Sequence, residues 1–349
     1  MRRARGRVAD SHPVDVSLLE WTITIAVTVG VLLFDVVVIA RNPHEPSMRE
    51  CAVALSIYVG AAIAFGCWIF LFHGSADGHN FGVEFFAGWL TEYSLSIDNL
   101  FVFIILMNAL AVPRHLQQEA LMVGIILALI FRAVFIAAGY TLIENFSWVF
   151  YIFGAFLVYT AYTLVKSYRD HDDEEHPEEN AVVLFARRRL NVGEEFQGLK
   201  LWYRLEGIRF VSPMLIVIIA LGTTDILFAL DSIPAIFGIT QEPYLVFTAN
   251  VFALMGLRQL YFLLGGLLQR LVYLSLGLSF ILAFIGVKLV LHALHENELP
   301  FLNGGEHITA VPEISSLVSL GVIVLTLVIT AVASLAKDKR DNERDEAGV

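Results

Sequence analysis

Two pairs of acidic residues lie inside long apolar segments of the chain. Glu92 and Asp98 belong to one segment. Asp225 and Asp231 belong to another, and in both pairs five residues separate the acids and a small polar residue follows the second. An ionised carboxylate at the centre of a membrane helix costs roughly 2.5–3.5 kcal/mol. Four such groups need an offsetting positive charge, which can come from a bound cation, from protons or from basic side chains.

The polar neighbours of the second acids indicate which cations would fit. Asn99 supplies a neutral side-chain oxygen beside Asp98, and the small polar Ser232 follows Asp231. Carboxylates combined with neutral oxygen donors, without cysteine or histidine, suit hard ions such as Mn²⁺, Mg²⁺ or Ca²⁺ rather than Zn²⁺ or Cu⁺. The residue types alone do not choose among these three ions.

Helix geometry limits how the acids of one pair can act together. Residues six apart on a helix are rotated by about 240° and separated by about 9 Å along the axis, so neither pair can hold one ion unaided. A break in the helix or a partner helix is required. Pro234 predicts such a break, because it cannot donate a hydrogen bond to the carbonyl of Leu230 and leaves that oxygen available beside Asp231.

Basic side chains inside the apolar segments offer a second explanation. Arg132, Arg258 and Lys288 could neutralise acids internally, but the four paired acids and Asp35 outnumber them. Asp35 lies about one turn from the end of the first apolar segment, where a solvated acid and an entry ligand are both consistent with its position. A bound cation, or protons in its absence, would balance the remaining charge.

The composition places these residues in a bilayer. Of the 349 residues, 57% are hydrophobic and 16% are charged, and the mean hydropathy is +0.70, well above what a soluble domain needs. Nine apolar runs are long enough to span about 30 Å of hydrocarbon. They cover residues 18–40, 51–72, 82–111, 117–140, 147–165, 213–238, 243–264, 271–292 and 314–336. We predict an all-α membrane protein with a single transmembrane transporter domain over 1–340, a cytoplasmic linker over 166–212 and a cytoplasmic tail over 341–349.

The basic residues of the loops predict the orientation of the chain. Lys and Arg concentrate in the loops that follow odd-numbered spans, and cytoplasmic loops carry this excess. We therefore expect a multi-pass protein of a bacterial inner membrane, with the N-terminus outside and the C-terminus in the cytoplasm. Four arginines in the first seven residues disagree with this orientation. The same basic stretch lacks a small-residue cleavage pattern, so we expect no signal peptide.

Two groups of three spans resemble each other. The pattern of acid, five residues, acid and small polar residue occurs in the third and sixth spans. An arginine followed seven residues later by glycine occurs in the fourth and seventh spans, as Arg132 with Gly139 and Arg258 with Gly265. Residues 82–165 and 213–292 therefore look like two copies of one unit. Three helices per copy make the copies inverted, which is typical of secondary transporters that bind substrate between the repeats.

The remaining composition excludes several classes. A net charge of −11 gives no support for a nucleic-acid partner. Cys51 and Cys67 fit neither a disulfide framework nor a thiolate metal site, and no residue pattern indicates a prosthetic group. Acids and histidines in the loops at 170–179 and 292–307 could collect metal, but solvated loops explain such runs equally well.

Two segments are similar to the signature segments of the TerC family. They read Glu92-Tyr-Ser-Leu-Ser-Ile-Asp-Asn-Leu-Phe-Val-Phe103 and Asp225-Ile-Leu-Phe-Ala-Leu-Asp-Ser-Ile-Pro-Ala-Ile236. Further similarity lies at 41–45, 151–157, 256–262 and 284–288, so that the resemblance covers roughly 18–336. It implies a membrane protein of the LysE-like transporter superfamily, related to the Alx-type exporters, that exports Mn²⁺ in exchange for protons.

The resemblance also implies a ligand set. The acidic centre of the family maps onto Glu92, Asp98, Asn99, Asp225, Asp231 and Ser232, and its first-span acid maps onto Asp35. One position departs from the family pattern. Many members have a glutamate three residues before the first aspartate of the second motif, where this chain has Gly222. The ligand set, and with it the ion preference, can therefore differ from that of those members.

The hypothesis from the sequence is export of a divalent cation, Mn²⁺ first, from the cytoplasm. The ion would pass Asp35, bind between Asp98 with Asn99 and Asp231, with the other two acids assisting, and leave as protons replace it. A Ca²⁺ or Mg²⁺ transporter of the same fold, and a membrane scaffold that aids protein insertion, are the alternatives. An oxyanion carrier is disfavoured because an acidic centre repels anions.

We do not expect this protein to be an enzyme. An intramembrane aspartyl protease would need a Gly-x-Gly-Asp motif, which the sequence lacks. The expected partners are a divalent cation, the lipid bilayer and protons as counter-ion, and a homo-oligomer is left open.

Overall fold

The computed structural model describes residues 16–41, 47–73, 75–76, 79–146, 148–170, 192–193, 195–205, 208–264, 272–295, 297, 299, 302–303, 308 and 311–346. Its helices are α1 (Leu18–Arg41), α2 (Met48–Phe72), α3 (Phe81–Ala109), α4 (Arg114–Asn145), α5 (Val149–Asp170), α7 (Pro213–Phe237), α8 (Pro243–Met255), α9 (Leu257–Leu264), α10 (Leu274–His295) and α11 (Ser316–Glu346). Two antiparallel hairpins join β1 (Ser75–Ala76) to β2 (His79–Asn80) and β3 (Trp202–Leu205) to β4 (Ile208–Val211).

Local sequence signals explain where several helices begin. The Ser47 hydroxyl accepts a hydrogen bond from the Glu50 amide, and the Glu50 carboxylate accepts one from the Ser47 amide at 2.8 Å, which starts α2. α7 begins after Ser212, with Pro213 at its first position. The amide N–H of the first helical residue has no acceptor within the helix, so proline, which lacks this N–H, is tolerated there.

The prediction of an all-α membrane protein is confirmed. Eight stretches of the described helices are long and apolar enough to cross a membrane. α1 is the ninth predicted span, and its described apolar stretch, Leu18–Val31, is shorter. Large apolar side chains such as Phe72 and Leu325 are exposed on the outside of the bundle, where lipid would surround them. The helices lie close to the predicted spans, except that α11 continues past residue 336 to Glu346.

The discontinuity in the helices lies at a different place from the predicted one. α7 runs unbroken to Phe237 with Pro234 inside its last turn, so the predicted break at Pro234 is wrong. Only three residues follow the proline in the helix, and the loss of one hydrogen bond so near the end does not interrupt it. The predicted seventh span is instead divided at Gly256, which separates α8 from α9.

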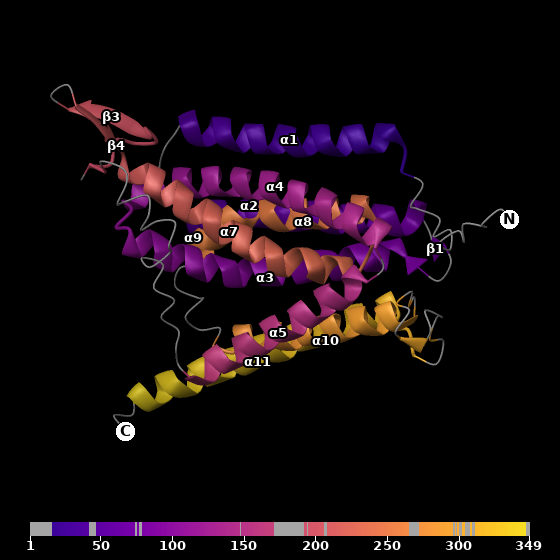
Figure 1. Ribbon diagram of the computed structural model, residues 1–349. Coiled ribbons are helices and arrows are strands. Elements are labelled where there is room, and N and C mark those ends of the chain that lie inside the picture. The colour runs from indigo at the N-terminus through magenta and orange to yellow at the C-terminus, as the bar shows by residue number, and fades with distance from the viewer. Residues whose placement is uncertain are drawn as a thin grey trace.

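The helices form two groups, which Figure 1 shows one above the other. The larger group contains α1 to α4 and α7 to α9, and the smaller contains α5, α10 and α11. One cluster of buried apolar side chains joins the groups, and its members include Phe85, Leu157 and Leu282. A second cluster, with Leu100 and Leu221 among its members, lies entirely within the larger group.

Contacts between helices follow the order expected of an inverted repeat. α3 packs against α8, α4 packs against α7, and α5 packs against α10. Exchanging α3 with α7, α4 with α8 and α5 with α10 leaves this set unchanged. Such contacts do not show that the two units superpose, so the inverted repeat stays a prediction. Gly265, which completes the second arginine–glycine match, lies outside the described residues.

α5 and α10 approach closely at two facing glycines. A Cβ atom at Gly154 would lie 2.8 Å from the carbonyl oxygen of Gly286, and one at Gly286 would lie 2.9 Å from that of Gly154. Further along, the rings of Tyr168 and Tyr273 lie 6.4 Å apart. These two contacts show that the helices are antiparallel and that their backbones nearly touch at the glycines.

We expect Gly154→Ala to lower the free energy of unfolding by about 1–3 kcal/mol, because the added methyl forces the two backbones apart. Gly60→Ala on α2 is the matched control, since a Cβ there meets nothing within 4 Å and alanine favours the helix by about 0.5–1 kcal/mol. Thermal unfolding of the purified protein in detergent measures both. Equal unfolding temperatures for the two variants would contradict the close contact.

Candidate functional site

Two of the four predicted acids meet at a buried arginine. Arg132 on α4 donates a hydrogen bond to Oε2 of Glu92 on α3 at 2.6 Å. Its second terminal nitrogen, Nη2, lies 3.7 Å from Oδ1 of Asp225 on α7, and Nη1 also donates a hydrogen bond to Oδ1 of Asn250 on α8 at 3.5 Å. All four side chains are buried. We call these four residues the arginine cluster, and it joins four helices of the larger group.

The arginine cluster contains two carboxylates and one guanidinium. Oε1 of Glu92 and Oδ2 of Asp225 are buried and make no hydrogen bond to the described part of the protein. Ser232 lies near Glu92, but its hydroxyl group makes no hydrogen bond. Buried oxygens without donors are costly. A proton on one of the two carboxylates would therefore stabilise this cluster.

The other two acids, Asp98 and Asp231, face the smaller helix group, and we call them the interface carboxylates. Asp98 on α3 accepts a hydrogen bond from Ser275 on α10 at 3.3 Å. Asp231 on α7 accepts one from Thr160 on α5 at 3.0 Å. Both carboxylates are half-buried, as is Asn99. No basic side chain among the described residues forms an ion pair with Asp231.

The antiparallel pair α5 and α10 fixes the relative depth of the hydroxyl residues that contact the interface carboxylates. The facing glycines align the two helices, so that Thr160 on α5 lies level with a position about five residues after Ser275 on α10. Five residues correspond to about 7 Å along the helix axis. The two hydroxyl groups beside Asp98 and Asp231 are therefore staggered along the α5–α10 pair. Within the part of the chain that the structure describes, no three His, Cys, Asp or Glu side chains converge to hold a metal ion.

Helical rotation explains why each acidic pair divides between two places. Glu92 faces α4, whereas Asp98, six residues later, faces α10. Asp225 faces α4, whereas Asp231 faces α5. The expectation that one pair cannot act alone agrees with these contacts, because each acid finds its partner on another helix.

The basic residues of the spans have different partners. Arg132 holds two of the acids, whereas Lys288 on α10 lies near Glu84 on α3. Arg258 is half-buried on α9, with Cys51 nearby. Internal neutralisation by a basic residue therefore accounts for the arginine cluster but not for Asp231.

Glu84 is a buried acid that the sequence motifs did not single out. It is 1% exposed and accepts hydrogen bonds from Thr240 at 2.6 Å and from Ser316 at 3.1 Å. Thr240 follows α7 and Ser316 begins α11, so Glu84 joins the two helix groups at the end far from the start of α7. Its position about two turns before Glu92 in the same span could have identified it from the sequence. The neutral partners Thr160, Ser275 and Asn250 gave no signal, because hydroxyl and amide side chains are common in membrane helices.

Two predicted positions lie apart from these clusters. Asp35 belongs to α1, but its side chain lies outside the described residues, so its role as an entry ligand stays a prediction. Gly222 is buried on α7, where a Cβ would lie 3.7 Å from side chains of Leu127 and Phe131 on α4. A glutamate at this position would start among apolar side chains rather than at the interface. The loop positions 171–179, 296, 298 and 307 also lie outside the described residues.

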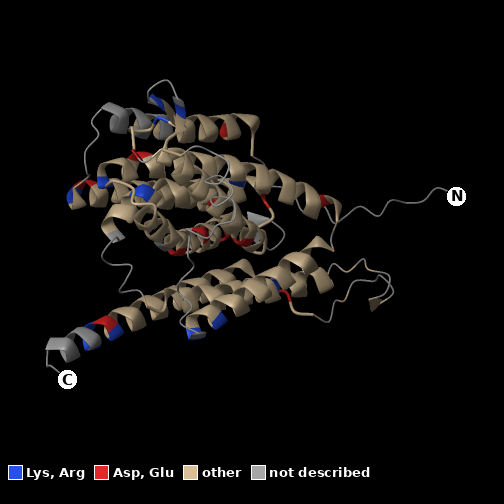
Figure 2. Cartoon of the chain, turned by 60° about the vertical axis from the view of Figure 1, so that its left-hand side comes forward, with Lys and Arg blue, Asp and Glu red and all other residues tan. Residues whose placement is uncertain are grey.

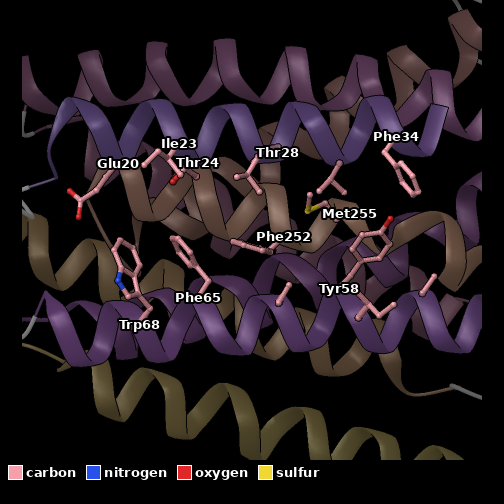
Figure 3. A pocket seen from close by; sticks show the side chains of 15 residues that line it. Glu20, Ile23, Thr24, Thr28, Phe34, Tyr58, Phe65, Trp68, Phe252 and Met255 are labelled. Atoms are coloured by element: carbon pink, nitrogen blue, oxygen red, sulfur yellow. The ribbon is translucent and has the colours of Figure 1, made fainter. Parts of the chain in front are cut away.

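A cavity of about 670 Å³ lies between α1, α2 and α8. Figure 3 shows Thr24, Phe65 and Phe252 among the side chains that line it. Glu20 is the one charged residue of this lining, and neither the arginine cluster nor the interface carboxylates take part. An apolar cavity does not replace the water around an ion, so we do not assign it to the cation.

Charged residues are unevenly distributed over the bundle. In Figure 2 most Lys and Arg lie at the ends of the helices on the side of the C-terminus, whereas several acids lie within the bundle. Residues of this basic end include Arg114, Lys166, Lys200 and Lys337. This agrees with the loop charges from which the orientation was predicted. Which end faces the cytoplasm stays a prediction.

The chain is similar over most of its length to known bacterial membrane proteins. The family model of the Integral membrane protein TerC family matches residues 77–342. An uncharacterized membrane protein of Mycobacterium tuberculosis is 46% identical over 317 residues, which cover 90% of this chain and 79% of that relative. One of Myxococcus xanthus is 35% identical over 319 residues, with 91% and 92% covered. The putative membrane-bound redox modulator Alx of Escherichia coli is 33% identical over 304 residues, with 86% and 90% covered. No solved structure matches the chain.

We expect Arg132→Gln to lower the free energy of unfolding by about 3–5 kcal/mol, because it leaves two buried carboxylates without their counter-charge. Arg114→Gln is the control: it removes the same charge from the exposed start of the same helix, where about 0.5 kcal/mol or less is expected. Thermal unfolding near neutral pH measures the difference. If both variants unfold at the wild-type temperature, the arginine cluster does not hold the helices together.

Proposed function

Because this chain belongs to the TerC family of integral membrane proteins, we propose that it is a secondary transporter that exports a divalent cation, Mn²⁺ first, from the cytoplasm in exchange for protons. The single observation that carries this proposal is the position of Asp98 and Asp231. They are half-buried carboxylates within membrane-spanning helices, and both face the boundary between the two helix groups.

The chemistry of this boundary favours a hard cation. Asp98, Asn99 and Asp231 offer oxygen atoms, and the hydroxyls of Ser275 and Thr160 lie beside them. Oxygen ligands of this kind suit Mn²⁺, Mg²⁺ and Ca²⁺. The preference for Mn²⁺ over the other two rests on the family resemblance and not on the geometry, so transport of Ca²⁺ or Mg²⁺ is the first alternative.

The placement of the interface carboxylates on two different helices suggests a passage in two steps. Asp98 contacts Ser275 on α10 and Asp231 contacts Thr160 on α5, so each carboxylate has its own hydroxyl partner in the smaller group. In our proposal the cation binds Asp98 with Asn99, keeps part of its water, and then passes to Asp231. A shift of one helix group past the other would bring the second carboxylate to the ion.

The arginine cluster takes a different part in this proposal. Its guanidinium repels a second cation, which disfavours direct binding of Mn²⁺ to Glu92 or Asp225. Its surplus carboxylate can instead hold a proton. We therefore assign Glu92 and Asp225 to anchoring the larger group and to proton binding, and not to the ligand shell that the sequence suggested. A scaffold function would leave the interface carboxylates without a role.

We expect Asp98→Asn and Asp231→Asn each to slow Mn²⁺ flux in proteoliposomes by roughly 10–100-fold, as judged from the cost of losing groups around a metal site. Glu144→Gln at the exposed end of α4 is the control and should keep wild-type flux. Mn²⁺, Ca²⁺, Mg²⁺ and Zn²⁺ are compared side by side with a fluorescent indicator inside the vesicles. Full Mn²⁺ flux in both aspartate variants would refute the assignment, and faster flux of Ca²⁺ or Mg²⁺ would correct the ion.

A further inference from the structure

The β3–β4 hairpin presents an unusual combination of side chains on one face. Trp202 pairs with Val211, and Arg204 pairs directly with Arg209. Because side chains alternate between the two faces of a strand, these four residues share a face. Trp202 is 65% exposed, and both arginines are exposed. Two guanidinium groups and an indole therefore project outward together.

The opposite face of the hairpin is directed toward the protein. The rings of Tyr203 and Phe210 stack with their centroids 6.0 Å apart, and both residues are half-buried. Gly193 leaves room for the Tyr203 hydroxyl, and Val192 bridges to Val211. The packing of this second face fixes which way the arginines point.

The arginine pair is unfavourable by itself. Like charges at directly opposite positions of two strands repel each other and destabilise the pairing. Among the described residues no acid forms an ion pair with Arg204 or Arg209. An anion between the two guanidinium groups would remove the repulsion, and phosphate fits the planar donor groups of arginine in two-point contact.

The hairpin is held at the start of a spanning helix. The Ser212 amide donates a hydrogen bond to the carbonyl of Leu201 at 2.9 Å, and the Ser212 hydroxyl caps α7 by accepting one from the Met214 amide at 3.3 Å. α7 is a membrane-spanning helix that starts at Pro213. Figure 1 shows the hairpin projecting from the bundle at this end of α7. The outward face therefore lies beside the end of a spanning helix.

We propose that the face formed by Trp202, Arg204 and Arg209 binds the phosphate-bearing headgroups of anionic phospholipids. Charge complementarity selects an anion, and the exposed indole selects the headgroup layer, where tryptophan is enriched in membrane proteins. Basic segments beside a spanning helix attract anionic lipid in the same way. Ser212 connects the hairpin to the start of α7, the helix that carries Asp225 and Asp231. The bound lipid therefore fixes the start of this helix. The inference does not depend on which ion is transported.

The test uses the full-length protein in neutral detergent. Phosphatidylglycerol is titrated into the wild type and the Arg204→Gln/Arg209→Gln variant, and the unfolding temperature is followed. We expect a rise for the wild type and an affinity about five-fold lower for each arginine lost, with no fall in unfolding temperature before lipid is added. An Arg114→Gln/Lys166→Gln variant, which removes two exposed charges from the same end of the bundle, should respond like the wild type.

Further arms separate the lipid from other occupants. Phosphatidylcholine and inorganic phosphate at the same concentrations should leave the unfolding temperature unchanged. Headgroup-labelled quencher lipids should reduce the fluorescence of the wild type more than that of Trp202→Phe. The proposal fails if the double-arginine variant responds like the wild type, or if inorganic phosphate reproduces the shift. It also fails if neutralising the acids at 172–175 without lipid changes the tryptophan emission of the wild type but not that of Trp202→Phe, because the chain's own acidic segment would then occupy the face.

Discussion

The buried contact of Arg132 with Glu92 and Asp225 is the interaction on which the arrangement of the larger helix group depends. It brings together three spanning helices from both halves of the chain, at a depth where neither charge can reach water. Separating these helices would expose an unpaired charge to hydrocarbon, which is far more costly than the loss of apolar contacts. The cluster therefore fixes how α3 and α7 are rotated about their axes. That rotation, in turn, directs Asp98 and Asp231 toward the smaller group.

The two acidic pairs thus divide into a fixed element and an accessible one. Glu92 and Asp225 are buried and held by a guanidinium, whereas the interface carboxylates are half-buried and receive hydrogen bonds from hydroxyls. A hydroxyl can be exchanged for a cation or for water at little cost, but a buried guanidinium cannot leave its partners cheaply. The same residue type therefore has two roles, which are set by its environment.

Much of this could be predicted from the sequence. Spans, their boundaries and the separation of the two acids in each motif follow from apolar length and from the 100° rotation per residue of a helix, because these depend on local geometry. The pairing of Arg132 with two of the acids could not be derived, since three bases were available and their partners depend on packing between distant segments. The predicted break at Pro234 is wrong because a proline near the end of a helix removes only one hydrogen bond, and the helix continues without it. Glu84 was missed because it stands outside the repeated motif, although its hydrogen bonds to Thr240 and Ser316 link the two helix groups.

The glycine contact between α5 and α10 has a consequence for any movement of the smaller group. No side chain lies between the two backbones at Gly154 and Gly286, so neither helix can slide or turn without driving main-chain atoms into each other. Thr160 and Ser275 are consequently carried on one stiff body, and their spacing does not depend on side-chain conformation. When that body shifts, the hydroxyls beside Asp231 and Asp98 are displaced together and by the same amount. A ligand that required such a shift at one carboxylate would therefore move the hydroxyl at the other as well.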